Sequence, residues 1–137
     1  MERVVLVVAL VLIALAAAAM LRRRQPDAPV GARDWEVPAQ IDRADFVEPS
    51  KPWLVAVFTS NTCDSCESAT AKASVVAGPN VAYQVVPWQE RKDLHERYGV
   101  EVVPMILVAD VDGVVQRSFI GVPSATDLWA AVAEARS

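Results

Sequence analysis

The chain contains two cysteines, Cys63 and Cys66, with only two residues between them. They follow an apolar run from Trp53 to Phe58 that is typical of a buried strand. At this spacing the two sulfurs can close a small disulfide ring at the start of a helix, where the helix dipole and free N–H groups stabilise a thiolate. Such a pair can exchange electrons with other disulfides, so it is the main indication of function.

The order of the two cysteines predicts their roles. The thiolate is the attacking species in thiol–disulfide exchange, so Cys63, at the start of the expected helix, is the candidate nucleophile. Its attack on an incoming disulfide forms a mixed disulfide. Cys66, one helical turn further on, then resolves this intermediate and releases the reduced partner. We expect both sulfurs to be exposed at the tip of the helix.

Polar and acidic residues surround the pair. The residues from Ser60 to Thr62 precede it and can cap the helix or donate hydrogen bonds to the sulfur. Asp64 lies between the cysteines and Glu67 follows them, and a negative charge beside a thiol disfavours its thiolate. We therefore expect the Cys63 thiolate to be less stabilised than in strongly oxidising pairs, so that the couple acts as a reductant or a mild exchanger.

Metal binding is the main chemical alternative. Structural zinc needs four Cys or His ligands, and the chain has two cysteines and one histidine, His95. Because His95 lies in a charged stretch, 90–97, we predict a solvated surface residue rather than a ligand. An iron–sulfur cluster would need cysteines from two chains. We therefore expect no metal and no other cofactor, and a purely structural disulfide is the remaining alternative.

The elements that must position the pair alternate between strand and helix. Strands are predicted at 54–58, 81–86, 105–109 and 114–119, after a weak first strand at 39–41. Helices are predicted at 66–76, 90–98 and 124–135, with a short helix or turn at 42–46. A capping box from Ser124 to Asp127 begins the last helix, and a hairpin turn from Asp110 to Gly113 joins the last two strands. This order predicts an α/β domain with a central mixed sheet and helices on both faces.

In this order the motifs resemble the thioredoxin family over residues 40–137. The matching features are the apolar strand, the Cys-Asp-Ser-Cys pair, the segment from Tyr98 to Pro104, a hairpin with Gly113 and Gly121, and the capped last helix. The resemblance implies a three-layer thioredoxin-like fold in which a cis bond places Pro104 against the cysteines. It also implies that the backbone of Val103 pairs with a substrate polypeptide as an added strand.

Several positions depart from the family's pattern. Thr62 stands directly before the pair, where the best-known members carry Trp, and Asp64 and Ser65 replace the familiar Gly and Pro. Val57 occupies the strand position that often carries a buried acid assisting the resolving thiol, and no obvious general base for Cys66 replaces it. The function predicted is therefore a thiol–disulfide oxidoreductase, with a thioredoxin-like binding module of little or no redox turnover as the alternative.

The N-terminal segment differs in composition from the rest of the chain. Val4 to Leu21 is an apolar run of 18 residues without a charge or a proline, and Arg22 to Arg24 follow it directly. As a helix it is about 27 Å long, close to the roughly 30 Å hydrocarbon thickness of a membrane. A cleaved secretory signal is the alternative, but the weakly basic start and the triple arginine favour a retained, single-pass anchor.

The sequence thus predicts three parts: an anchor with its basic flank at 1–24, a linker at 25–37 and a thioredoxin-like domain at 38–137. The arginines after the apolar run place the domain on the cytoplasmic side, with the extracytoplasmic side as the alternative. The domain carries 8 Lys and Arg against 13 Asp and Glu, which disfavours a nucleic-acid surface. We expect protein thiols or disulfides as substrates, and an external electron donor that restores the dithiol.

Overall fold

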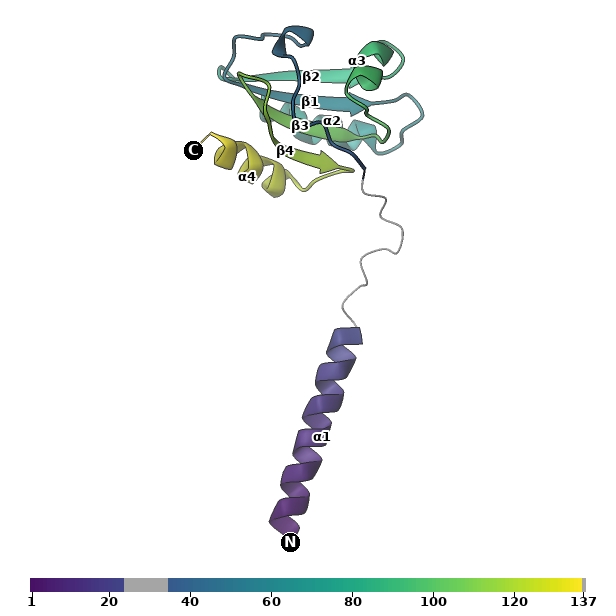
Figure 1. Cartoon of the computed structure of the whole chain (residues 1–137), viewed down its shortest axis with the longest axis vertical. Helices are drawn as coiled ribbons and strands as arrows, with labels where there is room; N and C mark the ends of the chain where they lie inside the picture. The colour runs from purple at the N-terminus through teal and green to yellow at the C-terminus, as the bar shows by residue number, and fades with distance from the viewer. Residues whose placement is uncertain (24–34, 137) are drawn as a thin grey trace. The chain divides into compact units, whose positions relative to one another are not determined.

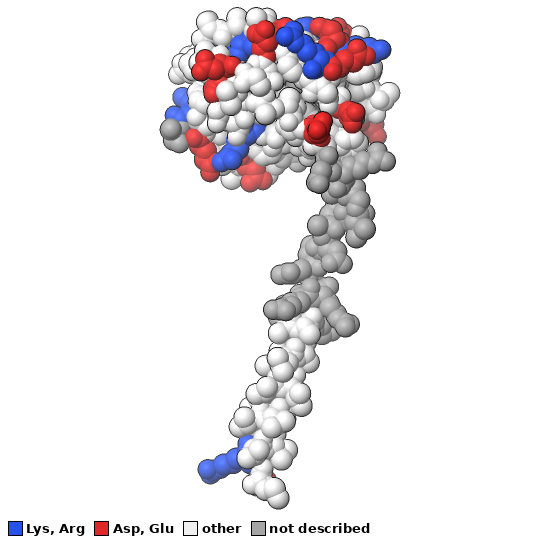
Figure 2. Space-filling view, viewed as in Figure 1, with Lys and Arg blue, Asp and Glu red and all other residues white. Residues whose placement is uncertain are grey.

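The computed structural model describes residues 1–23 and 35–136, and the chain divides into two units at residues 34 and 35. The first unit contains helix α1, Glu2–Arg23, whose side chains are exposed from residue 1 to 19. In Figure 2 its charged side chains gather at the N-terminal end, and none is drawn on the apolar stretch that follows as far as residue 19. Its Glu2–Ala19 window is long and apolar enough to cross a membrane, and a signal sequence near an N-terminus has the same properties. Residues 24–34, which include Arg24 and most of the predicted linker, lie outside the described residues.

The second unit is built on a mixed four-stranded sheet with the strand order β2-β1-β3-β4 (Figure 1). The strands are β1 (Trp53–Thr59), β2 (Val81–Pro87), β3 (Met105–Asp110) and β4 (Val115–Ile120). The β1–β2 pair is parallel and the other two pairs are antiparallel. Each of the four main strand predictions is confirmed to within one residue at either end.

The weak first strand predicted at 39–41 is wrong. This segment makes one isolated bridge, between Gln40 and Val114, and Ile41 N–H donates to the carbonyl of Gly113 at 2.8 Å. Its hydrogen bonds therefore go to the turn of the β3–β4 hairpin and its immediate surroundings, so no continuous ladder forms. Gly113 has a φ of +81°, and a Cβ there would meet the Ile41 carbonyl oxygen at 2.0 Å, so this close approach requires glycine.

Helices cover both faces of the sheet, as predicted. They are α2 (Cys66–Ser74), α3 (Lys92–Arg97) and α4 (Ala125–Ala135), with a 3₁₀ turn η1 (Arg43–Asp45). The capping box of α4 is confirmed, because the Ser124 hydroxyl accepts the Asp127 N–H at 3.0 Å. Helices α2 and α3 are each shorter than predicted, because turns occupy residues 75–76 after α2, and residues 88–90 and 98–99 on either side of α3.

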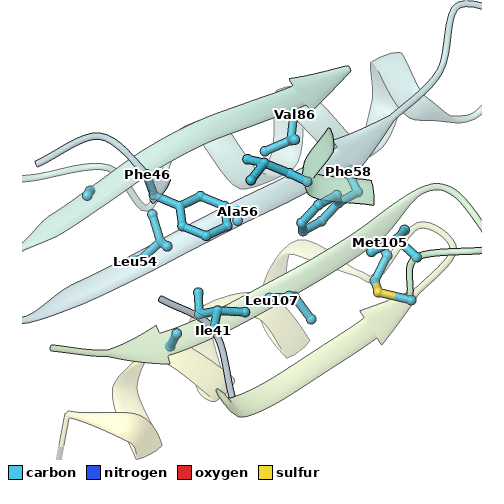
Figure 3. Packing of buried hydrophobic residues seen from close by; sticks show 12 residues of the cluster. Ile41, Phe46, Leu54, Ala56, Phe58, Val86, Met105 and Leu107 are labelled. Carbon is cyan, nitrogen blue, oxygen red and sulfur yellow. The ribbon is translucent and has the colours of Figure 1, made fainter. Parts of the chain in front are cut away.

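Side chains of the central strands alternate between two cores. Leu54, Ala56 and Phe58 of β1 point to one face (Figure 3), and Val55 and Val57 point to the other; all five are fully buried. Burial on both faces explains the continuous apolar run in the sequence. We call the first the α3 face, with core residues Ile41, Phe46, Leu54, Ala56, Phe58, Ala82, Val86, Leu94, Val100, Met105, Leu107 and Ala109. We call the second the α2/α4 face, with core residues Val55, Val57, Ala69, Ala73, Val76, Val81, Ile106, Val108, Leu128 and Val132.

A buried arginine closes the end of the sheet opposite the cysteine pair. Arg43 donates to the carbonyl oxygens of Lys51 at 3.0 Å, Asp110 at 2.9 Å and Glu48 at 3.2 Å. Burial lowers the pKa of Arg43, while the neighbouring Asp110 carboxylate raises it. These bonds connect the N-terminal segment of the domain to the start of β1 and the end of β3. The cysteine pair lies at the opposite end of β1.

Candidate redox site

The cysteine pair lies between the end of β1 and the beginning of α2. Cys63 and Cys66 are joined by a disulfide, with their Cα atoms 5.5 Å apart. Cys66 is the first residue of α2, and Cys63 lies in the preceding turn, where its N–H donates to the Ser60 carbonyl at 3.2 Å. The structure therefore brings together the two sulfurs on which the predicted chemistry depends.

The two cysteines differ in exposure, so the prediction that both are exposed is wrong for Cys66. Cys66 is only 5% exposed, whereas Cys63 is partly exposed. The reason is the helical period: Cys66, Ala69 and Ala73 lie on one side of α2, and that side packs against the sheet. Cys63 is therefore the more accessible of the two cysteines, while its role as the nucleophile stays a prediction.

The polar residues before the pair do not cap α2, contrary to prediction. The N-cap is Ser65, and its side chain makes no capping hydrogen bond. The hydroxyl groups of Ser60 and Thr62 bond each other at 3.2 Å, because the helix begins too far along the chain for them to reach its free N–H groups. The hydroxyl beside the nucleophile is that of Ser65, with its oxygen 3.8 Å from the Cys63 sulfur.

The Val103–Pro104 peptide bond is cis, as the resemblance implied. The β1–β3 register places it at the cysteine end of the sheet, because Phe58 pairs with Met105 and the next residues outward are Thr59 and Pro104. Pro104 is buried and Val103 is partly exposed. The turn before α2 and the cis bond thus lie at the same edge of the sheet, while a substrate-binding role for the two residues stays a prediction.

The prediction for His95 is wrong, because its side chain is buried, with 2% exposed. Its Nε2–H donates to the Val86 carbonyl at 2.8 Å, and its ring lies edge-on to those of Phe58 and Trp88, with centroids 5.0 and 5.3 Å away. The short helix α3 turns Leu94 and His95 toward the sheet and its charged residues toward solvent. Only the position of His95 directly after the one apolar residue of this stretch hinted at burial.

Sequence reasoning did not predict the cavity of about 590 Å³ that lies beside the pair on the α3 side. Its lining includes Ser60, Trp88, His95 and Val103, together with the carboxylate-bearing residue Glu101. The backbone N–H of Trp88 donates to the carbonyl of Thr59, the last residue of β1, at 2.8 Å. This bond holds Trp88 at the cysteine end of the sheet. An aromatic residue directly after a strand was the only signal for this cavity in the sequence.

The strand position that often holds an acid in thioredoxins is aliphatic and fully buried here. Val57 is fully buried and belongs to the α2/α4 face, together with Ala69 and Ala73 of α2. Within residues 1–23 and 35–136, no group of three or more His, Cys, Asp or Glu side chains could hold a metal ion. The site as described is therefore a disulfide, a cis-proline turn and an adjoining cavity.

Solved structures share this architecture. Fasciola hepatica thioredoxin is 21% identical over 64% of this chain and 84% of its own, with a TM-score of 0.55. Thioredoxin F from spinach chloroplast is 19% identical over 74% of this chain and 98% of its own, with a TM-score of 0.55. A mutant thioredoxin from Halobacterium salinarum NRC-1 is 18% identical over 63% and 76%, with a TM-score of 0.56. No family model and no curated protein sequence matches this chain. The chain therefore has the thioredoxin fold, as the resemblance implied.

Proposed function

We propose that this chain is a thioredoxin-family thiol–disulfide oxidoreductase that is anchored to a membrane by α1 and exchanges disulfides with protein partners. The observation that carries the proposal is the disulfide between a partly exposed Cys63 and a buried Cys66 at the start of α2, within a thioredoxin fold. The fold and the pair together support this class of reaction.

In the reducing direction, the Cys63 thiolate attacks one sulfur of a substrate disulfide. The substrate S–S bond breaks, and the departing sulfur leaves as a thiolate that takes a proton from water. Cys66 then loses its proton and attacks the Cys63 sulfur, which breaks the mixed disulfide and releases the second substrate thiol. The substrate gains two electrons and the protein is left with the Cys63–Cys66 disulfide. An external dithiol donor restores the reduced pair by the reverse sequence.

Substrate positioning is assigned to Val103 and Pro104. The partly exposed Val103 offers its backbone to an extended polypeptide, which adds to the protein as a short strand. Pro104 has no N–H, and its carbonyl accepts the Gly121 N–H at 2.9 Å, so it is already paired within the domain. The position of both residues at the cysteine end of β1 and β3 supports this role.

A second candidate is a thioredoxin-like binding module with little redox turnover. One observation favours it: the fully buried side chain of Val57 is aliphatic and cannot take the proton from Cys66. Without such a base, resolution of the mixed disulfide depends on water or on the substrate for proton removal. The two candidates therefore differ in the lifetime and turnover of the mixed disulfide.

Trapping of partners tests the redox function. A Cys66→Ser variant should accumulate mixed disulfides through Cys63 in cells, visible as reducible adducts on non-reducing gels. The matched Cys63→Ser variant should give none, because it lacks the attacking sulfur. If Cys66→Ser captures no partner, and the purified full chain in neutral detergent does not reduce hydroxyethyl disulfide, the redox function is contradicted and the binding module stands.

Membrane anchoring and sidedness need their own test. The apolar run from Val4 to Leu21 is proposed as a retained span, with the domain on the cytoplasmic side because of the arginines that follow. The N-terminal residues should then be present in protein recovered from membranes, and the domain should resist protease added to intact cells. Loss of the first residues would indicate a cleaved signal. Digestion of the domain would place it outside, where it would maintain the thiols of apocytochromes or enzymes.

A further inference from the structure

We propose that the cavity beside the redox pair is a subsite for a basic side chain, Lys or Arg, of the polypeptide whose disulfide is exchanged. The inference rests on the proposed function and adds to it the chemical class of substrate. Four kinds of observation carry it: the cavity's connection to the cysteines, its apolar walls, an aromatic face that already meets an ammonium group, and carboxylates without a basic residue among its lining.

The cavity is connected to the redox pair through the backbone on two sides. Ser60 lines it, and the Ser60 carbonyl accepts the N–H of Cys63 at 3.2 Å. Val103 also lines it and directly precedes the cis-proline. A polypeptide that pairs with Val103 while its sulfur meets Cys63 therefore places a side chain one or two residues away, about 3 to 7 Å along the strand, near the cavity.

The walls of the cavity suit a long aliphatic stem. Trp88, Val100 and Val103 provide apolar surface, and the buried His95 is held in place by its hydrogen bond to the Val86 carbonyl. Because that bond uses the Nε2–H, the imidazole is fixed as part of the wall. The volume of about 590 Å³ accommodates the four-carbon stem of a lysine or the guanidinium of an arginine.

The indole of Trp88 already faces a cation. The side chain of Trp88 is 37% exposed, and the ammonium nitrogen of Lys92 lies 5.5 Å from its ring centroid. A positive charge at this distance from an indole face is attracted by the ring quadrupole. The indole face can therefore hold a cation, and a substrate cation would use it in place of Lys92.

The charged residues that line the cavity are acidic. Glu96 and Glu101 are both exposed, and no Lys or Arg of the described residues contributes to the lining. Glu96 pairs with Lys92 at 3.5 Å, whereas Glu101 makes no ion pair within the described part of the chain. A lysine or arginine can bury its stem against the apolar wall and present its charged end to Glu101. An acidic side chain at the same place is repelled.

Disulfide-containing peptides test the subsite. We would use peptides with one intramolecular disulfide that differ only in a Lys, Gln or Glu two residues from the first cysteine. The rate at which each oxidises the reduced full chain in neutral detergent is measured by alkylation of the remaining thiols. We expect the Lys peptide to react roughly five-fold faster than the Glu peptide at low salt, because an exposed ion pair and a cation–π contact each contribute modestly. At about 1 M salt, where the screening length is about 3 Å, the rates should converge.

Variants assign the preference to Glu101. Glu101→Gln should reduce the Lys-to-Glu rate ratio, and Glu101→Arg should invert it. Glu90→Gln is the matched control, because Glu90 is an exposed acid on the β2–α3 connection, two residues after Trp88, that does not line the cavity, and it should keep the ratio. Equal rates for the three peptides, or a ratio unchanged by Glu101→Arg, would overturn the subsite.

Failure of the subsite and failure of the redox function give different results. If hydroxyethyl disulfide and all peptides react, but without charge preference, the redox function stands and the subsite is refuted. If no disulfide reacts, fluorescence anisotropy of labelled peptides with Ser in place of Cys decides the subsite independently. Tighter binding of the Lys peptide than of the Glu peptide, lost in Glu101→Gln, would support it, and equal binding would refute it.

Discussion

The two faces of the sheet use different side chains and have different relations to the cysteines. The fully buried core of the α2/α4 face is aliphatic, and the helix that begins with Cys66 packs on it through alanines. The α3 face is rich in rings: Phe46 and Phe58 meet edge to face at 6.5 Å, and His95 lies edge-on to Phe58. The first face fixes the position of the disulfide, while the second forms a wall of the cavity that adjoins it. The face that holds the disulfide and the face that borders the proposed subsite are therefore on opposite sides of one sheet.

The largest expected effect comes from placing an acid on the α2/α4 face. Val57→Asp puts a carboxyl group at the fully buried position that often carries an acid in thioredoxins. We expect the free energy of unfolding to fall by about 3 to 5 kcal/mol, because a buried charge lacks a partner there. We also expect the mixed disulfide to resolve faster at neutral pH, because the carboxylate can take the proton from Cys66.

Val55→Asp is the matched control for that variant. Val55 lies on the same face of β1, two residues further from the site, and is equally buried. Urea unfolding should show a similar loss of stability, and rapid-quench analysis should show no gain in the rate of resolution. If both variants speed resolution equally, or neither does, this face acts only as a support for the helix.

A smaller effect is expected from the α3 face. His95→Ala removes a ring packed between two others and leaves the Val86 carbonyl without its donor, so we expect a loss of about 2 to 3 kcal/mol. His95→Phe keeps a ring and removes only the donor, and should cost about 1 to 2 kcal/mol. Both values come from urea unfolding at neutral pH. If His95→Ala lowers the free energy of unfolding by less than about 0.5 kcal/mol, the size typical of a surface substitution, the α3 face does not depend on this histidine.

Tyr83 allows a gentler test of how α2 is held. Its hydroxyl donates to the Thr70 carbonyl at 3.0 Å, so Tyr83→Phe should cost about 1 kcal/mol. Burial raises the pKa of Tyr83 above its ordinary value of 10.0. The neutral hydroxyl therefore stabilises the fold fully below about pH 10, and this contribution is lost as the pH rises through the raised pKa. Unfolding measured across that range should show a steeper alkaline loss for the wild type than for Tyr83→Phe, and parallel curves would contradict the assignment.

The smallest effect concerns the turn that passes from β1 to α2. Asp64 is exposed between the cysteines, and removing its charge in Asp64→Asn should lower the pKa of the Cys63 thiol. Thiolate absorbance during a pH titration, in a Cys66→Ser background with one thiol, measures this directly. Asp112→Asn, an exposed acid at the far hairpin, is the control and should leave the titration unchanged. An unchanged pKa in Asp64→Asn would remove the electrostatic argument for a mild redox couple.

The same comparison explains what the sequence could predict. Along β1, alternate residues enter two cores, so the run from Trp53 to Phe58 indicates a doubly covered strand without any knowledge of its partners. The disulfide between cysteines at this spacing and the capping box of α4 depend on local sequence and were also predicted, whereas the cis bond before Pro104 was implied by the resemblance to the thioredoxin family. His95 was not, because its burial depends on how the short helix α3 turns against β2. The unequal exposure of the cysteines likewise depends on which side of α2 packs on the sheet.

Predicting the cavity from the sequence would have required knowledge of which strands pair and in which register. Ser60, Trp88 and Val103 come from three separate connections, and only the order and register of β2, β1 and β3 bring them together. No local pattern carries that information. The charges of Glu96 and Glu101 were visible in the sequence, but their relation to the redox pair was not.

The unequal shielding of the two sulfurs has a practical consequence for chemical labelling. A bulky maleimide added to the fully reduced protein should couple to Cys63 and be excluded from Cys66, which is 5% exposed. Intact-mass measurement should then show a single increment per chain. Such a tag would report the redox status of the pair without any change to the sequence.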